Sequence, residues 1–232
     1  MSKRVKSIDN IALAGYISRQ LNHFFPDEQP VTAPHVQVYI DGVEERVFTC
    51  FTGIRKKYFN EGERVLFNHL QSDQYSMYLY MLANYVHTHD GNTAIATKLY
   101  CLNKALHSVD MFFTTQLPDI FLLVHPLGTI MGRGTFGNYF VAYQGCTVGC
   151  LNEGIFPTIG ERVIMYANAA ILGNCTIGSN VCIAAGVSVI NTNIPADVIV
   201  FGEYPNYRFA PNRKDYWMRP PFYYDIYDQA TK

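Results

Sequence analysis

One histidine, His125, stands where its side chain could act as a base. It precedes Pro126, and glycines follow it three and seven residues later, at Gly128 and Gly132. The pKa of an ordinary histidine lies near neutral pH, so an imidazole can take a proton from a reacting hydroxyl group. The alternative is a histidine that only faces solvent or bonds to the backbone before a proline. The residue type alone leaves both roles open.

Three small residues could line a groove for a long, flexible ligand. Ala167 and Ala185 are eighteen residues apart, and Gly149 precedes them both. A narrow carrier molecule can lie along a wall only where the side chains are small and backbone groups can be reached. Small residues also suit tight corners, so the pattern has a purely structural explanation as well.

The cysteines show no metal or redox motif, because C-x-x-C pairs and paired histidine spacings are both absent. We therefore predict reduced, buried thiols and no metal site. Residues 132–137 match G-x-G-x-x-G, but that motif binds dinucleotides between a strand and a helix, with an acidic residue about twenty positions later. Short segments punctuated by glycine follow it here. We predict no dinucleotide-binding fold.

The residues that must position these groups repeat with a period of six. An aliphatic residue occurs at every sixth position from 159 to 189, namely Ile159, Met165, Ile171, Ile177, Ile183 and Val189. This period fits neither a helix nor a half-buried strand, so it must come from a unit that repeats as a whole. Glycine and asparagine lie between the aliphatic positions, where a corner needs positive φ.

Each unit is predicted to be a short strand followed by a turn. Three units close a triangular coil of about eighteen residues, and stacked coils share one continuous core. We therefore predict a parallel β-solenoid over residues 121–203. Tyr143 and Ile159 are sixteen positions apart, which is not a multiple of six, so the phase breaks between them. Residues 150–157 are therefore predicted to leave a corner as a loop, a common place for binding residues.

The first 120 residues carry helical patterns, so the fold class is α+β: an N-terminal all-α domain followed by the solenoid. Apolar spacing predicts helices over residues 8–22, 43–59, 73–92 and 93–113, with Ser72 and Asp73 as possible N-cap residues. Such a domain would cap the open end of the solenoid. Residues 204–232 form a C-terminal tail, predicted to pack on a neighbouring subunit or partly to cover a ligand's phosphates.

The composition excludes several functional classes. The chain has 232 residues, is 49% hydrophobic and carries a net charge of -1, with no cluster of Lys or Arg. These values argue against a nucleic-acid partner. The N-terminus is not followed by the apolar stretch of a signal peptide, and no window approaches eighteen apolar residues. We therefore predict no membrane span and expect a cytoplasmic protein.

The sixfold repeat resembles that of the hexapeptide-repeat acyltransferases, whose solenoid is a left-handed parallel β-helix. Within that family the closest resemblance is to serine O-acetyltransferase, over about Asp73 to Pro205. The family's first catalytic coil reads Asp-His-Ala-Thr-Gly-Ile-Val-Val-Gly-Glu-Thr-Ala, and its histidine and two glycines coincide with His125, Gly128 and Gly132. Allowing one deleted residue, Gln144 in Tyr-Gln-Gly-Cys-Thr-Val-Gly resembles the family's Leu-Gln-Ser-Val-Thr-Leu-Gly.

This resemblance implies an acetyl-CoA-dependent O-acetyltransferase in which His125 is the base and the acceptor hydroxyl attacks the thioester directly. It implies that Asp73, in a match to the family's Asp-x-Tyr-Ser, holds the ammonium group of the acceptor. It also implies that Gly149, Ala167 and Ala185 line the acetyl-CoA groove. Homotrimers, or pairs of trimers joined through their helical domains, are implied too, with each site between two subunits.

Departures from the family's pattern keep the acceptor open. Val124 replaces the aspartate before the histidine, and Ile155 and Phe156 replace an arginine and a histidine of the loop. A buried charge without a partner is costly, so free L-serine fits poorly unless other groups substitute. A hydroxyl of a sugar or polysaccharide is the alternative acceptor. A solenoid without catalytic activity, serving as a binding or assembly protein, is a second alternative.

Overall fold

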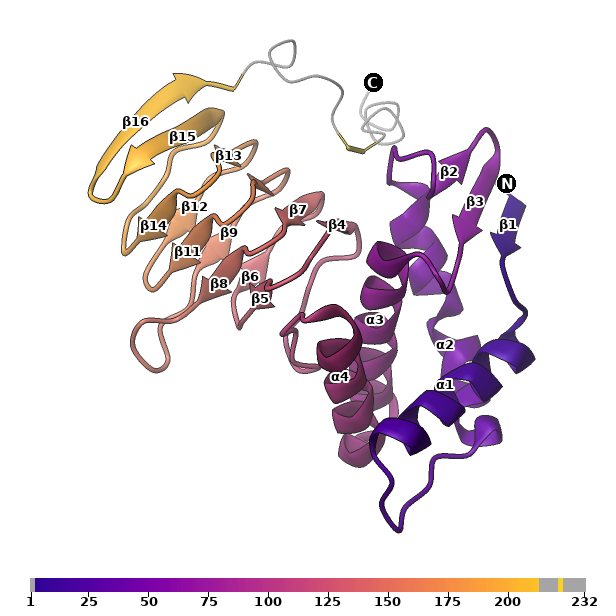
Figure 1. The fold of residues 1–232 in the computed structure, drawn as a ribbon. Helices are drawn as coiled ribbons and strands as arrows, with labels where there is room; N and C mark the ends of the chain where they lie inside the picture. Colours follow the sequence, from indigo (N-terminus) through magenta and orange to yellow (C-terminus); the bar gives the residue numbers. More distant parts are fainter. Residues whose placement is uncertain (1–2, 213–220, 223–232) are drawn as a thin grey trace.

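The computed structural model describes residues 3–212 and 221–222, which form four helices followed by a parallel β-solenoid (Figure 1). The helices are α1 (Asn10–Phe24), α2 (Ala33–Thr52), α3 (Ser72–Asp90) and α4 (Thr93–His107). A three-stranded sheet of β1 (Lys3–Lys6), β2 (Asn60–Glu61) and β3 (Arg64–Phe67) lies with them. The helical prediction is confirmed, whereas this small sheet was not predicted.

Local capping explains where the helices begin and end. Asp9 caps α1 by accepting the N–H of Ala12, and α4 ends at Ser108, a left-handed residue with φ of 55°. The predicted helix over 93–113 was therefore too long. The helix predicted over 43–59 is α2, which begins ten residues earlier than predicted. Pro34 does not prevent this start, because a proline is tolerated in the first turn of a helix.

The solenoid strands form three faces. The largest sheet has the order β16-β15-β13-β10-β7-β4, and the others have the orders β14-β11-β8-β5 and β12-β9-β6. The strands are β4 (Phe121–Val124), β5 (Ile130–Met131), β6 (Thr135–Phe136), β7 (Phe140–Tyr143), β8 (Thr147–Gly149), β9 (Thr158–Ile159), β10 (Ile164–Met165), β11 (Ala170–Leu172), β12 (Thr176–Ile177), β13 (Cys182–Ile183), β14 (Ser188–Ile190), β15 (Val198–Glu203) and β16 (Asn206–Pro211).

The register confirms the three-sided coil. Ile164 pairs in parallel with Cys182, and Ala170 pairs with Ser188, each eighteen residues further along the chain. All six aliphatic residues of the sixfold set are at most 2% exposed, so they form the shared interior. The segment over 132–137 lies in this solenoid as β6 and its flanking turns, rather than in a dinucleotide-binding unit.

The helical domain covers the first coil, while β16 closes the other end. Cys50 of α2 donates its thiol to the carbonyl of Phe121, and all four residues of β4 are buried. At the far end, β16 pairs antiparallel with β15 (Figure 1). The sequence did not predict β16, which lies in the predicted C-terminal tail. Residues 213–220 and 223–232 of the predicted tail lie outside the described residues.

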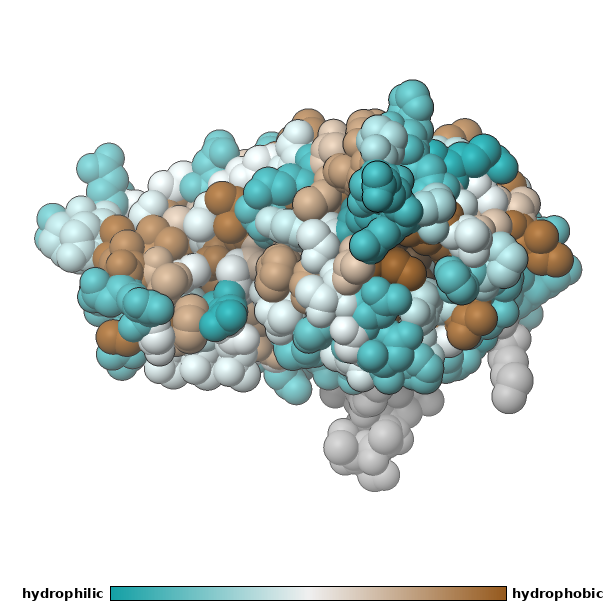
Figure 2. Space-filling model, turned by 90° about the horizontal axis from the view of Figure 1, so that it is seen from below, coloured by the Kyte–Doolittle hydropathy of each residue, from teal (hydrophilic) through white to brown (hydrophobic). Residues whose placement is uncertain are grey.

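The outer surface mixes polar and apolar residues. On the face shown in Figure 2, hydrophobic residues form separate patches over both the solenoid and the helical domain, divided by polar residues. Among the described helices, none is both long enough and apolar enough to cross a membrane.

Candidate active site

His125 occupies an unusual backbone conformation directly after β4. Its φ is 48°, in the left-handed region, and its carbonyl accepts the N–H of Leu127 at 2.7 Å. A residue other than glycine pays about 1–2 kcal/mol for this conformation, and a following proline favours extended backbone instead. The side chain is 74% exposed in the single chain. The surroundings must therefore hold this turn, which is a common feature of functional sites.

Asp73 provides the contact that holds the turn. It lies in the first turn of α3 with its side chain 1% exposed, and its Oδ1 accepts the backbone N–H of His125 at 3.1 Å. The same oxygen is 3.9 Å from His125 Nδ1, and the hydroxyl of Tyr58 donates to Oδ2 at 3.4 Å. Burial raises the pKa of Asp73, while His125 and Tyr58 act in the opposite direction.

A column of backbone hydrogen bonds places two of the predicted wall residues at the same corner as His125. Gly145 N–H donates to the carbonyl of Leu127, Asn168 N–H to that of Gln144, and Gly186 N–H to that of Ala167, each at 2.9 Å. Ala185 directly precedes the last donor. The corner requires glycine at 145, because φ is +69° and an added Cβ would lie 2.1 Å from Asn168 Oδ1.

Gly149 lies at the other end of strand β8. Its carbonyl accepts the N–H of Gly173 at 2.9 Å, and an added Cβ would meet no atom within 4 Å. Gly149 is four positions after Gly145, which lies in the turn before β8, and four extended positions span about 13 Å. Within one chain, therefore, His125, Ala167 and Ala185 share a corner, whereas Gly149 lies at the opposite edge of the sheet.

The predicted loop follows Gly149 at that opposite edge. Residues 150–157 connect β8 to β9, and both Leu151 and Ile155 are exposed. The guanidinium of Arg133 lies 6.0 Å from the centre of the Phe156 ring. The loop prediction is confirmed, and the loop exposes apolar Leu151 and Ile155 beside polar Asn152 and Glu153.

Two tyrosines beside His125 were not found from the sequence. Tyr143 pairs in register with Val124, the residue before the histidine, and its ring stacks on that of Tyr166 at 5.1 Å. Tyr58 reaches Asp73 from the segment after α2. Burial raises the pKa of Tyr58 to about 12 and also raises that of Tyr143. One available signal was the tyrosine at 143, where the family's Leu-Gln motif has leucine.

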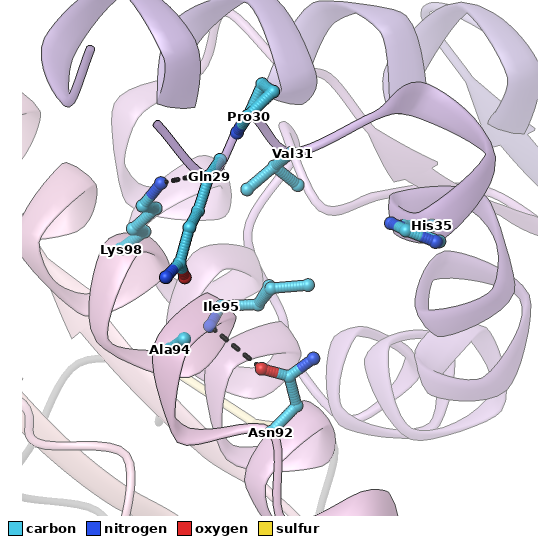
Figure 3. Close-up of a pocket in the computed structure, with 8 residues that line it drawn as sticks. All are labelled: Gln29, Pro30, Val31, His35, Asn92, Ala94, Ile95 and Lys98. Carbon is cyan, nitrogen blue, oxygen red and sulfur yellow. Dashed lines mark hydrogen bonds between the residues drawn. The ribbon is translucent and has the colours of Figure 1, made fainter. Parts of the chain in front are cut away.

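A separate cavity of about 180 Å³ lies in the helical domain, between the α1–α2 connection and the start of α4 (Figure 3). Its cation, Lys98, already pairs with Asp27 at 2.7 Å and donates to the carbonyl of Gln29 at 2.8 Å. Asn92 caps α4 by accepting the N–H of Ile95. We see no reactive arrangement there. In the described part of the chain, no group of three His, Cys, Asp or Glu side chains could hold a metal ion.

Comparisons with known proteins agree with this architecture. Residues 156–200 match the family described as bacterial transferase hexapeptide (six repeats). Serine acetyltransferase of Synechococcus elongatus is 33% identical over 105 residues, covering 44% of this chain and 43% of that protein. The enzyme of Staphylococcus xylosus is 32% identical over 116 residues, covering 45% and 53%. The matched regions thus span about half the length of these curated relatives.

Solved structures extend the similarity to the helical domain. Serine acetyltransferase of Neisseria gonorrhoeae superposes with a TM-score of 0.68 at 21% identity, over 90% of this chain and 84% of that one. The enzyme of Brucella abortus gives 0.65 at 21% identity, over 87% and 83%. The shared fold is a helical domain followed by a left-handed parallel β-helix. Residues 156–200 therefore match bacterial transferase hexapeptide repeats, and the chain has the fold of the serine acetyltransferases.

Proposed function

We propose that this chain is an acetyl-CoA-dependent O-acetyltransferase of the serine acetyltransferase type. The observation that carries the proposal is the turn at His125, held by buried Asp73 and placed at the foot of a corner lined by Ala167 and Ala185. A base at the end of a smooth wall is what direct transfer from a long thioester carrier requires.

The proposed reaction is a single displacement. Asp73 lies on the Nδ1 side of His125, so Nε2 is the nitrogen left to accept the proton of the acceptor hydroxyl. As that proton moves, the acceptor oxygen bonds to the thioester carbon. The carbon–sulfur bond then breaks, and the departing thiolate takes the proton from the imidazolium. The products are the acetyl ester and free CoA, and no covalent enzyme intermediate forms.

Asp73 acts in this proposal as a positioning residue. Its Oδ1 fixes the backbone of His125 and its Oδ2 accepts from Tyr58, so both oxygens already have partners. A carboxylate beside a base also stabilises the imidazolium that forms during transfer. The role predicted from the resemblance, holding the ammonium group of an acceptor, requires this buried carboxylate to exchange one of those contacts.

The acetyl-CoA groove is proposed to run along the corner of Ala167 and Ala185. A serine acetyltransferase of Brucella abortus with a TM-score of 0.59 to this chain was solved in complex with coenzyme A. Gly149 would join the groove only from a neighbouring subunit, because it lies at the opposite edge of the sheet in its own chain. We therefore propose a homotrimer, or a pair of trimers, with each site between two subunits.

Exposed apolar residues beside the site support that assembly. Leu127 is 63% exposed and Ile130 is 44% exposed, next to the His125 turn. A measurement of the molecular mass in solution tests this assembly, and a monomer that retains full activity would contradict it.

A cytoplasmic location is part of the same proposal, because the cysteines of the described chain are all free.

The proposal has two candidate acceptors, L-serine and a sugar hydroxyl. The names of the relatives favour L-serine. A sugar hydroxyl is favoured by the apolar residues at the loop and before the base, which are Val124, Ile155 and Phe156.

The test compares binding with turnover in the purified full chain. We expect wild-type protein to release CoA from acetyl-CoA when an acceptor is supplied, and His125→Ala to lose this turnover while binding acetyl-CoA with unchanged affinity in calorimetry. If His125→Ala turns over at the wild-type rate, the histidine is not the base. If wild-type protein neither binds nor consumes acetyl-CoA, the chain is a solenoid without this activity.

A further inference from the structure

The surface beside the base is built from tyrosines. Val124 precedes His125 and pairs in register with Tyr143 on the adjacent strand, where neighbouring strands lie about 4.8 Å apart. Leu123 and Ala142 pair in the same register and are fully buried in the solenoid interior. Because successive strand residues point to opposite faces, Val124 and Tyr143 project from the outer face, next to the histidine.

Two further rings extend this surface. Tyr166 follows Met165, which is buried in the interior and pairs with Ala142, so Tyr166 also projects outward, one strand beyond Tyr143. The two rings stack with an interplanar angle of 27°. From the helical domain, Tyr58 places its hydroxyl 3.4 Å from Asp73 Oδ2. We call Tyr58, Tyr143 and Tyr166 the tyrosine surface. It runs from Asp73 along the outer face of the solenoid.

The chemistry of this surface suits an uncharged ligand. All three phenols are half-buried, and burial raises their pKa values, so they stay neutral at physiological pH. A neutral phenol can both donate and accept a hydrogen bond, and its ring offers an apolar face. Pockets of this kind recognise a ligand by its apolar body and a few hydroxyl groups.

A free amino acid finds fewer partners here. Its ammonium group would need a carboxylate, but Asp73 is buried with both oxygens engaged and Val124 stands at the position next to the base. Its carboxylate would need a cation, yet the loop itself offers Ile155 and Phe156. Arg133, which lies against the Phe156 ring, is at the opposite edge of the sheet from His125 in the same chain. Charged groups left without partners on binding cost more than neutral hydroxyls that find phenols.

We propose that the tyrosine surface is the acceptor subsite and that the acceptor is an uncharged, hydroxylated ring, such as a pyranoside. One hydroxyl faces His125 Nε2, while a C–H face of the ring packs on Tyr143. This inference rests on the proposed acetyl transfer and names its substrate class.

The experiment measures acceptor-dependent release of CoA with three kinds of acceptor: methyl pyranosides, L-serine, and glycerol as a hydroxylated acceptor without a ring. We expect wild-type protein to prefer a pyranoside. Tyr143→Ala should raise the KM for that pyranoside by about tenfold, the loss expected when one ring face is no longer covered. The same variant should lose clearly less kcat/KM with glycerol than with the pyranoside, because glycerol has no ring face to pack on Tyr143.

Two variants control for folding and for the hydroxyl. Tyr143→Phe keeps the ring and loses one neutral hydrogen bond, so its KM should rise by only about threefold. Tyr85→Ala removes a ring from another stacked pair, with His89 at 5.0 Å in α3, and should leave the KM for the pyranoside unchanged.

The outcomes separate this inference from the proposed function. Preference for L-serine over every pyranoside, with turnover still dependent on His125, overturns the inference and leaves the acetyltransferase standing. An unchanged KM for the pyranoside in Tyr143→Ala overturns it as well. Absence of any CoA release with all three kinds of acceptor counts against the proposed function itself.

Discussion

Replacing Asp73 with asparagine should reduce turnover without unfolding the protein. The substitution keeps the shape of the side chain. It also keeps an oxygen that can accept the backbone N–H of His125, which in the wild-type chain lies 3.1 Å from Oδ1. It removes the negative charge 3.9 Å from Nδ1 of His125. Because a developing imidazolium loses this partner, the cost should appear in the transition state rather than in the folded ground state.

The magnitude follows from the contact and its exposure. Two unit charges 3.9 Å apart interact by about 4 kcal/mol at an effective dielectric constant of about 20. The imidazole is 74% exposed, so solvent screening reduces this value. A loss of about 2 kcal/mol remains, which corresponds to a decrease of about thirtyfold in kcat.

Stability should respond differently. Burial disfavours the charged form of Asp73, as its raised pKa shows, so the neutral asparagine removes a desolvation cost while it weakens one hydrogen bond. We expect the free energy of unfolding to change by less than about 1 kcal/mol.

The assay is steady-state CoA release, combined with urea unfolding of each variant. Asp9→Asn is the matched control, because Asp9 also accepts a backbone N–H, from Ala12 at 2.8 Å, but caps α1. Its kcat should equal that of wild type. A kcat for Asp73→Asn within about twofold of wild type, well short of the thirtyfold loss, would refute the reasoning. A large loss of stability with unchanged kcat would show that Asp73 has only a structural role in the first turn of α3.

Three further predictions concern acid stability, the corner and the groove. Burial lowers the pKa of His107 to about 4, so the unfolded chain alone takes up a proton as pH falls from about 6.5, and up to about 3 kcal/mol of stability is lost by pH 4. His107→Gln should abolish this part of the loss in urea unfolding at pH 7 and pH 4.5; equal losses in both proteins would disprove it. Gly145→Ala should lower the free energy of unfolding by at least about 1 kcal/mol more than Gly91→Ala, since both glycines have φ near +70° but only the first would contact Asn168; equal costs would contradict the corner geometry. Ala185→Leu should raise the KM for acetyl-CoA with little change in kcat, and an unchanged KM would remove Ala185 from the groove.

The sixfold repeat was sufficient to predict the solenoid because each coil is a local unit. The six interior aliphatic positions from Ile159 to Val189 follow from one phase, and the coil length of eighteen residues reappears in the pairing of Ile164 with Cys182. The loop after Gly149 was equally predictable, because residues that do not fit the sixfold repeat cannot lie on a face of the coil and must form a loop. Such features depend on neighbours close in the sequence.

The rest depends on contacts that no local pattern encodes. β1 pairs with β3 about sixty residues away, through a short charged strand that carries no strand signal of its own. Pro34 could equally end one helix or begin another, and only the packing of α2 decides between them. Tyr58 and Asp73 meet because a loop returns to the start of α3. For the same reason, the role of His125 was predicted only from the resemblance, and its contact with Asp73 was not predicted.

The fate of the acetyl group tests the central claim most directly. Acetyl-CoA labelled in its acetyl group would be incubated with the preferred acceptor and either wild-type protein or His125→Ala, and the label would be followed into the acceptor ester. The account predicts an ester formed by wild-type protein, released CoA in equal amount, and at most a trace with the variant. Label transfer at equal rates by both proteins would contradict it.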